Sequence, residues 1–136
     1  MTYPCKGILI DPFACSVTEV DLPGPYSCLY PVLSHESMPV DLFTTAYPPW
    51  LEDNDCILVD DEGLLKPCDR FFFADGYPQP LAGKGIVLGA DDKGETIAPR
   101  TSLVTVKARI TFLARGGPHL FATTTPWQPP TGNNAK

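Results

Sequence analysis

Residues 7–22 read GILIDPFACSVTEVDL, two apolar segments separated by a run of turn-forming residues. In the second segment, outward and inward positions alternate, which places Val17, Glu19 and Asp21 on one face and Thr18, Val20 and Leu22 on the other. A period of two residues is typical of a half-buried strand. Asp-Pro and the residues up to Ser16 favour a turn. The stretch therefore predicts two strands joined by a tight loop, and Pro23-Gly24-Pro25 ends the second strand.

Residues 56–66, CILVDDEGLLK, have the pattern of a hairpin. A strand over 56–60 is followed by Asp61-Glu62-Gly63, and Leu64–Lys66 would form the returning strand. Glycine after two acidic residues supplies the positive φ that such turns require.

Several shorter segments predict further strands and one helix. The expected strands are 40–46, the aromatic triplet at 71–73, 85–90, and 95–97 after a turn at 91–94. Pro25 can occupy the first position of a short helix, with apolar residues at helical spacing at Tyr26, Leu29, Tyr30 and Leu33.

Residues 103–113, LVTVKARITFL, fit two patterns. As a strand they would direct Val104, Val106, Ala108, Ile110 and Phe112 to the core. As a helix they would bury Leu103, Val106, Ile110 and Leu113. The β-branched residues at the centre favour a strand.

These elements predict an α+β fold dominated by an antiparallel or mixed β-sheet, with six to eight short strands and one or two short helices. The chain of 136 residues is long enough for one domain, and its 16 prolines disfavour a bundle of long helices. We expect a single domain over 1–113 and a flexible tail over 114–136, which is rich in proline, glycine and asparagine.

The cysteine usage and the apolar runs bear on the compartment. Five cysteines are present, without a Cys-x-x-Cys pair and without a secretory signal, so we expect reduced thiols in the cytoplasm. Their spacing does not suit a zinc site, and we expect neither a metal nor another cofactor. The apolar runs fall short of the roughly 20 residues that span a bilayer, so we expect no membrane partner.

The net charge of −6 is unevenly distributed. Residues 1–96 carry all 16 acidic residues, whereas residues 97–136 carry five basic residues and no acidic one. An acidic body opposes direct nucleic-acid binding, because phosphates require clustered lysine and arginine. It suits a basic partner, or a protein surface that otherwise holds nucleic acid.

The sequence resembles a small family of unknown function that is common in phages and other bacterial mobile elements. The resemblance covers about residues 7–97 and lies in three segments: Asp11, Pro12, Val17, Glu19 and Val20; then Asp60 to Lys66; then Gly85, Val87, Gly89, Asp92 and Gly94. It implies an α+β domain in a phage or prokaryotic setting and implies no reaction.

The leading hypothesis is a non-enzymatic phage or mobile-element accessory protein that binds a host protein, such as a defence nuclease or restriction component that it would inhibit. The candidate contact residues are exposed aromatics and the acidic hairpin tip, because aromatics anchor interfaces. They are Trp50, Asp60, Asp61, Glu62 and Phe72. If the acidic tips at 60–62 and 91–95 lie side by side, they form one negative patch.

Two other hypotheses remain open. The chain could be a small-ligand or nucleotide-binding module, such as a sponge for a signalling nucleotide, that uses Arg70, Lys84 and the backbone amides near Gly83 and Gly85. It could also be an enzyme built on Asp60, Asp61 or His35. No recognised catalytic motif supports the latter, so we assign no catalytic residue.

Overall fold

The computed structural model describes residues 5–22, 29–35, 38–63 and 68–114. Within this part, the chain forms nine strands and two short helices, and every strand pairing is antiparallel. The predicted α+β class holds at this level, with more strands than expected because two strands contain only two residues. No helix among the described residues is long and apolar enough to cross a membrane.

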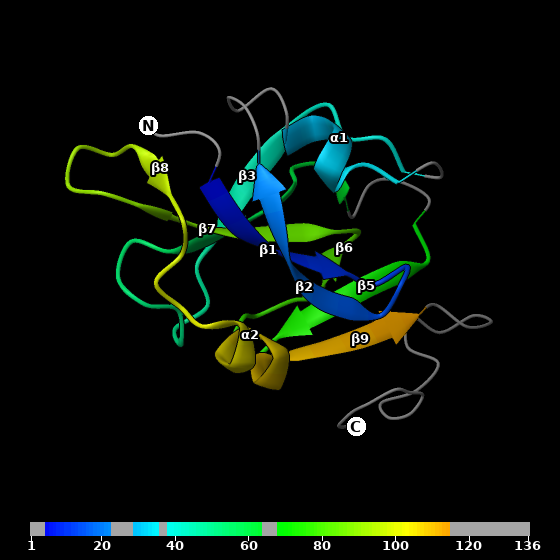
Figure 1. Ribbon diagram of the computed structural model, residues 1–136. Coiled ribbons are helices and arrows are strands. Elements are labelled where there is room, and N and C mark those ends of the chain that lie inside the picture. Colours follow the sequence, from blue (N-terminus) through cyan, green and yellow to red (C-terminus); the bar gives the residue numbers. More distant parts are fainter. Residues whose placement is uncertain (1–4, 23–28, 36–37, 64–67, 115–136) are drawn as a thin grey trace.

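The larger sheet brings distant parts of the chain together (Figure 1). Its order is β2 (Ser16–Leu22), β1 (Cys5–Asp11), β7 (Gly85–Ala90), β4 (Cys56–Asp60) and β3 (Phe43–Ala46). The short β8 (Thr96–Ile97) pairs with the end of β7. The central strands β7 and β4 are almost completely buried, which explains why their sequences are continuous apolar runs.

A smaller sheet packs against the larger one. It has the order β6 (Leu81–Ala82), β5 (Arg70–Ala74) and β9 (Ile110–Ala114). Phe72, Ala74 and Leu81 from this sheet meet Ile57 and Val87 from the larger sheet in one buried cluster. On the opposite face of the larger sheet, α1 (Leu29–Leu33) packs Leu29 and Leu33 against Leu58, Ile86 and Leu88. The larger sheet therefore has apolar cover on both faces.

The β1–β2 hairpin forms as predicted, with Leu9 opposite Thr18 and Asp11 opposite Ser16. Its turn is stabilised by the carboxylate of Asp11, whose Oδ1 accepts hydrogen bonds from the amides of Phe13 at 2.9 Å and Ala14 at 3.2 Å. Cys15 closes the turn with a φ of 53°. The Asp-Pro signal thus acts through side-chain bonding to the local backbone.

The strand predicted for 103–113 is wrong over its first part. Residues Leu103–Arg109 form α2, and only Ile110–Ala114 form β9. Ser102 is the N-cap of α2, because its side chain accepts a hydrogen bond from the amide of Thr105 at 3.1 Å. Val104, expected in the core, is 77% exposed, whereas Val106 is fully buried as both patterns required.

Other predictions hold only in part. The expected strand over 40–46 begins at Phe43, and the returning strand at 64–66 lies outside the described residues. Along 57–59, β4 pairs with both β3 and β7, so its two edges are occupied. The beginning of the predicted helix, before Leu29, and the tail after Ala114 also lie outside the described residues.

Candidate functional site

Trp50 lies in a turn after β3, where it is half buried against the core between the two sheets. Its indole N–H donates a hydrogen bond to the main-chain oxygen of Asp75 at 2.8 Å. This bond joins the two sheets, so Trp50 has a structural role besides any contact it makes. The exposed aromatic of the segment is Tyr47, which is 65% exposed. Within this aromatic and proline-rich segment, the sequence predicts Trp50 as the contact residue, whereas the structure exposes Tyr47.

The three acidic residues at the end of β4 have two different roles: Asp60 is buried, whereas Asp61 and Glu62 are exposed. Asp60 is only 7% exposed, and its Oδ1 accepts a hydrogen bond from the amide of Glu62 at 2.9 Å. Asp60 therefore shapes the turn, as aspartate commonly does at this position. The next two residues, Asp61 and Glu62, have exposed side chains, and these are the carboxylates that the tip offers to a partner.

Phe72 is fully buried on β5, so it is not available to a partner on the surface of this domain. Its ring packs directly over Gly85, where a Cβ would lie 2.8 Å from Phe72 Cζ and 2.9 Å from Ile57 Cγ2. The prediction that Phe72 contributes to an interface is corrected for this reason: both faces of β5 are covered at this position.

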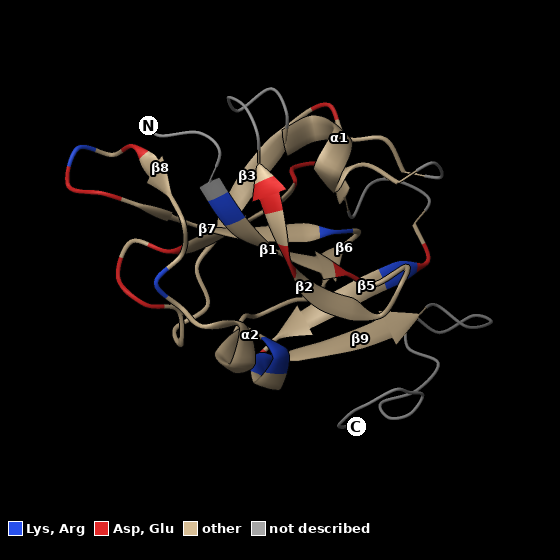
Figure 2. Cartoon of the chain, in the orientation of Figure 1, with Lys and Arg blue, Asp and Glu red and all other residues tan. Residues whose placement is uncertain are grey.

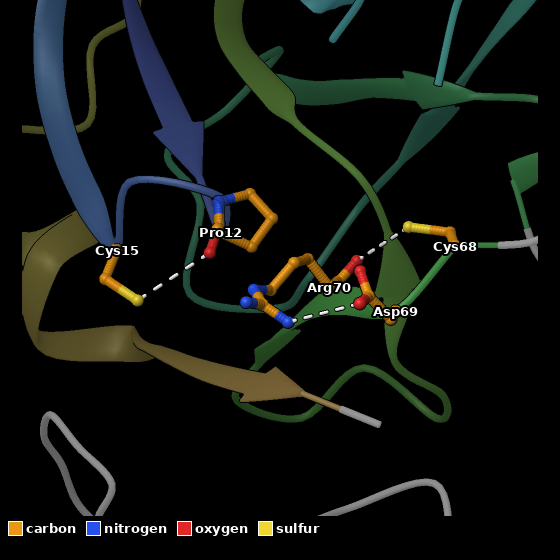
Figure 3. Close-up of polar contacts among 5 residues, drawn as sticks. All are labelled: Pro12, Cys15, Cys68, Asp69 and Arg70. Atoms are coloured by element: carbon orange, nitrogen blue, oxygen red, sulfur yellow. Dashed lines mark hydrogen bonds and ion pairs between the residues drawn. The ribbon is translucent and has the colours of Figure 1, made fainter. Parts of the chain in front are cut away.

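The residues proposed for ligand binding lie close together, but their backbone groups are already hydrogen-bonded to other parts of the protein. The oxygen of Arg70 accepts hydrogen bonds from the amide of Gly83 at 3.0 Å and from Cys68 Sγ at 3.0 Å (Figure 3). Gly85 is paired on both sides, with Ile10 and Val59. The Gly83 amide is therefore not free to bind a phosphate, and Gly85 lies in the interior of the sheet.

The Arg70 guanidinium lies over the β1–β2 turn. Its Nη1 is 3.5 Å from Asp69 Oδ2, and the close-up shows its side chain extending towards Pro12 and Cys15 (Figure 3). Half-exposed ion pairs of this kind stabilise a fold only slightly. Lys84 is partly exposed at the start of β7.

The Cys15 and Cys56 thiols are not activated for nucleophilic chemistry. Burial raises the pKa of the Cys15 thiol, and the nearby Arg70 lowers it only in part. Burial also raises the pKa of Cys56, with Asp55 adding to the effect. A nucleophilic cysteine requires the opposite shift. His35, the candidate base, stacks on Phe13 with ring centroids 3.8 Å apart.

Acidic residues lie on both the loop before β4 and the β7–β8 turn, two loops on the same side of the molecule in Figure 2. The guanidinium of Arg100 links this loop to the end of β7, because its Nη1 donates to the main-chain oxygens of Asp53 at 3.4 Å and Ala90 at 3.0 Å. The condition for one joint acidic patch is not met, because β4 and β7 run antiparallel and hold the 60–62 and 91–95 tips at opposite ends. The described residues contain no group of three or more potential metal ligands.

Two pockets flank β3, the last strand of the described larger sheet. One, of about 260 Å³, is lined by Thr45, Tyr47, Asn54, Cys56, Leu58, Leu88, Gly89, Ala90, Gly94 and Thr96. The other, of about 130 Å³, is lined by Thr44, Thr45, Val59, Asp60, Asp61, Gly63, Tyr77, Gln79, Leu81 and Ala82. Leu58 and Val59 are consecutive on β4, so the two pockets open on opposite faces of the sheet.

Comparison with protein-family models, with curated protein sequences and with solved structures finds no match for this chain. The resemblance to the phage family stays a prediction. The candidate site is therefore defined by its own geometry: the β3 edge, its two pockets and the exposed acidic residues beside it.

Proposed function

We propose that this protein is a small non-enzymatic accessory protein of a phage or mobile element that binds a host protein. The observation that carries the proposal is the exposed surface around β3. Tyr47 is 65% exposed at one end of the strand and Leu42 is 54% exposed at the other. Exposed apolar groups rimmed by charged ones are typical of protein-binding surfaces.

The side chains with reactive chemistry support binding rather than catalysis. Asp55 and Asp60 are buried and accept hydrogen bonds from the backbone. The Cys15 and Cys56 thiols have raised pKa values, which hold them in the unreactive protonated form near neutral pH. The exposed carboxylates of Asp61 and Glu62 are free to meet a basic surface. A host nuclease or restriction component presents such a surface for DNA, and inhibition of it is the function we propose.

The proposal is tested by affinity capture from a bacterial host lysate, with proteins and small molecules both quantified in the eluate. We expect one host protein in a stoichiometric amount, and its loss with Tyr47→Ala or with the pair Asp61→Lys and Glu62→Lys. Glu19→Lys is the matched control, because it reverses an exposed charge on β2, at the opposite end of the sheet order.

A bound nucleotide without a protein partner would instead support the small-ligand hypothesis. The larger pocket beside β3 favours such a ligand to a limited extent, because hydroxyls of Thr45, Tyr47 and Thr96 line it. None of its lining residues carries a charge, so it suits a neutral ligand better than a nucleotide phosphate. Arg70→Ala and Lys84→Ala would then show whether the cationic side chains contribute.

A further inference from the structure

The larger of the two pockets lies on the face of the larger sheet that carries α1. Leu58 and Leu88 line it, and both side chains also belong to the buried cluster beneath α1. Cys56, which is opposite Leu88 in the pairing of β4 with β7, is half buried and lines the pocket beside them. The pocket therefore has an apolar floor that is formed by the sheet itself.

Four uncharged polar side chains also line this pocket. They come from separate segments: Thr45 on β3, Tyr47 directly after β3, Asn54 in the loop before β4, and Thr96 on β8. Hydroxyl and amide groups both donate and accept hydrogen bonds. None of these four side chains forms a hydrogen bond within the described part of the chain. The pocket therefore offers donor and acceptor groups to a ligand.

The charge around the pocket is mainly negative, although none of its lining residues is charged. Its lining residues Asn54 and Gly94 lie in two loops whose other members are acidic except for Lys93: Glu52, Asp53 and Asp55, and Asp91, Asp92 and Glu95. The Arg100 guanidinium is bonded to main-chain oxygens of these segments. Phosphates and carboxylates are bound best by charged donors, which the lining lacks, so the pocket suits an uncharged ligand.

The size of the pocket limits the ligand further. Its volume is about 260 Å³, just below the range of about 300–1,000 Å³ that is typical for drug-sized ligands. A ligand of this size has one ring system and a small substituent. An apolar floor beside hydroxyl and amide groups suits a flat ring with apolar faces and a polar edge. Tyr47 adds an aromatic ring, on which such a ring can stack.

We propose that this pocket binds an uncharged heteroaromatic compound of the nucleobase type, such as a free nucleoside. One face of the ring would lie on Leu58 and Leu88, and its edge would bond to the hydroxyls of Thr45 and Thr96. A base within single-stranded nucleic acid has the same ring, but its phosphates would meet the acidic loops. The free compound is therefore the ligand. The site shares Tyr47 with the proposed host-protein surface but does not depend on that function.

The test uses the full-length, isotope-labelled protein with adenosine, guanosine, cytidine and uridine, each compared with its 5′-monophosphate. We expect saturable shifts of the Leu58 and Leu88 methyl groups and the Thr96 amide in nuclear magnetic resonance spectra with at least one nucleoside. Its monophosphate should bind at least about threefold more weakly. The bound nucleoside should also slow alkylation of Cys56 by iodoacetamide. Cys15, which is exposed in the β1–β2 turn, is the internal control and should react at an unchanged rate.

Variants separate the contributions of the pocket. Ala90→Leu places a larger side chain in the lining and should weaken binding at least about tenfold. Tyr47→Ala should weaken it at least about fivefold, whereas Tyr47→Phe retains the stacking ring and should cost less. Thr96→Val removes one hydroxyl and should weaken binding about two- to tenfold. Thr18→Val removes an exposed hydroxyl on β2, outside the pocket, and should leave binding unchanged.

Three results would overturn the inference: no binding of any of the four nucleosides, binding that leaves Cys56 alkylation unchanged, or equal binding by a folded Ala90→Leu variant. Equal or tighter binding of a single-stranded oligonucleotide would also overturn it, because nucleic acid would then be the ligand. If no nucleoside binds but a host protein is captured, the proposed function stands and only this site fails. If Ala90→Leu loses the nucleoside and still captures the host protein, the two sites are distinct, as we propose.

Discussion

Asp55 is the side chain that joins the loop before β4 to the segment leading into α2. It is 3% exposed and accepts hydrogen bonds from the amide of Arg100 at 3.1 Å, the amide of Thr101 at 2.7 Å and the Thr101 hydroxyl at 2.7 Å. In the sequence, Asp55 stands among other acidic residues and has no distinguishing pattern. Its burial and its three donors, which come from a segment about 45 residues away, are set by the tertiary structure and are not visible in the local pattern.

Asp55→Ala should therefore destabilise the domain strongly, because it leaves three donors without their acceptor. A buried unsatisfied group costs about 1–3 kcal/mol, so we expect a loss of at least this size in urea unfolding. Asp55→Asn keeps one acceptor oxygen and should cost less. Asp92→Ala, in the exposed β7–β8 turn, should change stability by less than about 0.5 kcal/mol. Equal effects of Asp55→Ala and Asp92→Ala would contradict this account.

Gly85 is required by the close approach of Phe72 and Ile57 rather than by turn geometry or ligand binding. Gly85→Ala should destabilise by about 1–3 kcal/mol, the usual cost of overpacking a core. If the cost arises from the Phe72 ring, adding Phe72→Leu should recover part of it, and the two changes should be non-additive in a double-mutant cycle of thermal unfolding. Simple additivity of the two substitutions would show that the strain lies elsewhere.

The raised thiol pKa of Cys56 predicts that the folding stability of the domain falls at alkaline pH. Burial, aided by Asp55, raises this pKa above its ordinary value of 9.0, so the unfolded thiol releases its proton first. The resulting stability is complete below pH 9.0 and is lost as the pH rises through the higher folded pKa. Urea midpoints should therefore fall between about pH 8 and about pH 10. Cys56→Ala should show a smaller fall, and an equal fall in both proteins would reject the assignment.

At the scale of elements, local signals predicted those structures that depend on local contacts. The β1–β2 hairpin depends on the turn at Asp11 and on a strand whose polar and apolar residues alternate. Both features can be recognised in the sequence of residues 7–22. The segment 103–113 was misread because one apolar pattern covers a helix and a strand in succession. Its decisive features are the Ser102 cap before it and the pairing of β9 with β5, which begins at Ile110.

Ser102→Ala tests the capping argument for α2. Loss of the bond from the Thr105 amide should cost about 1 kcal/mol in urea unfolding, as for other helix N-caps. Ser102→Asp should restore most of it, because aspartate also accepts this bond and places a negative charge at the helix start. No difference between the alanine and aspartate variants would indicate that packing of Val106 alone determines the helix.

At the scale of the whole molecule, the strand order could not be predicted from the sequence. Strand β7 pairs with β1, about 80 residues before it, and with β4, about 30 residues before it, and no local pattern specifies either pairing. The pairing with β4 also decides the candidate site. It brings the end of β7 close to the loop that contains Asp53, and it holds the 91–95 turn at the opposite end of the strands from Asp61 and Glu62. The two acidic tips therefore form separate surfaces, and β3 is the last strand of the larger sheet among the described residues.

The same topology predicts an uneven distribution of amide hydrogen exchange. Strands β7 and β4 are buried on both faces and paired on both sides, so their amides should exchange only on global unfolding and define the slowest class. Amides of β8 and α2 should exchange faster, because β8 has two residues and α2 buries only Val106. Hydrogen-bonded and non-hydrogen-bonded pairs alternate along an antiparallel ladder, and the amide of Asp61 donates to the oxygen of Leu42. The amide of Thr44 therefore faces β4 and should be protected, whereas that of Thr45 faces away from β4 and should exchange quickly. Slow exchange at Thr45 would mean that its amide is hydrogen-bonded in the free protein.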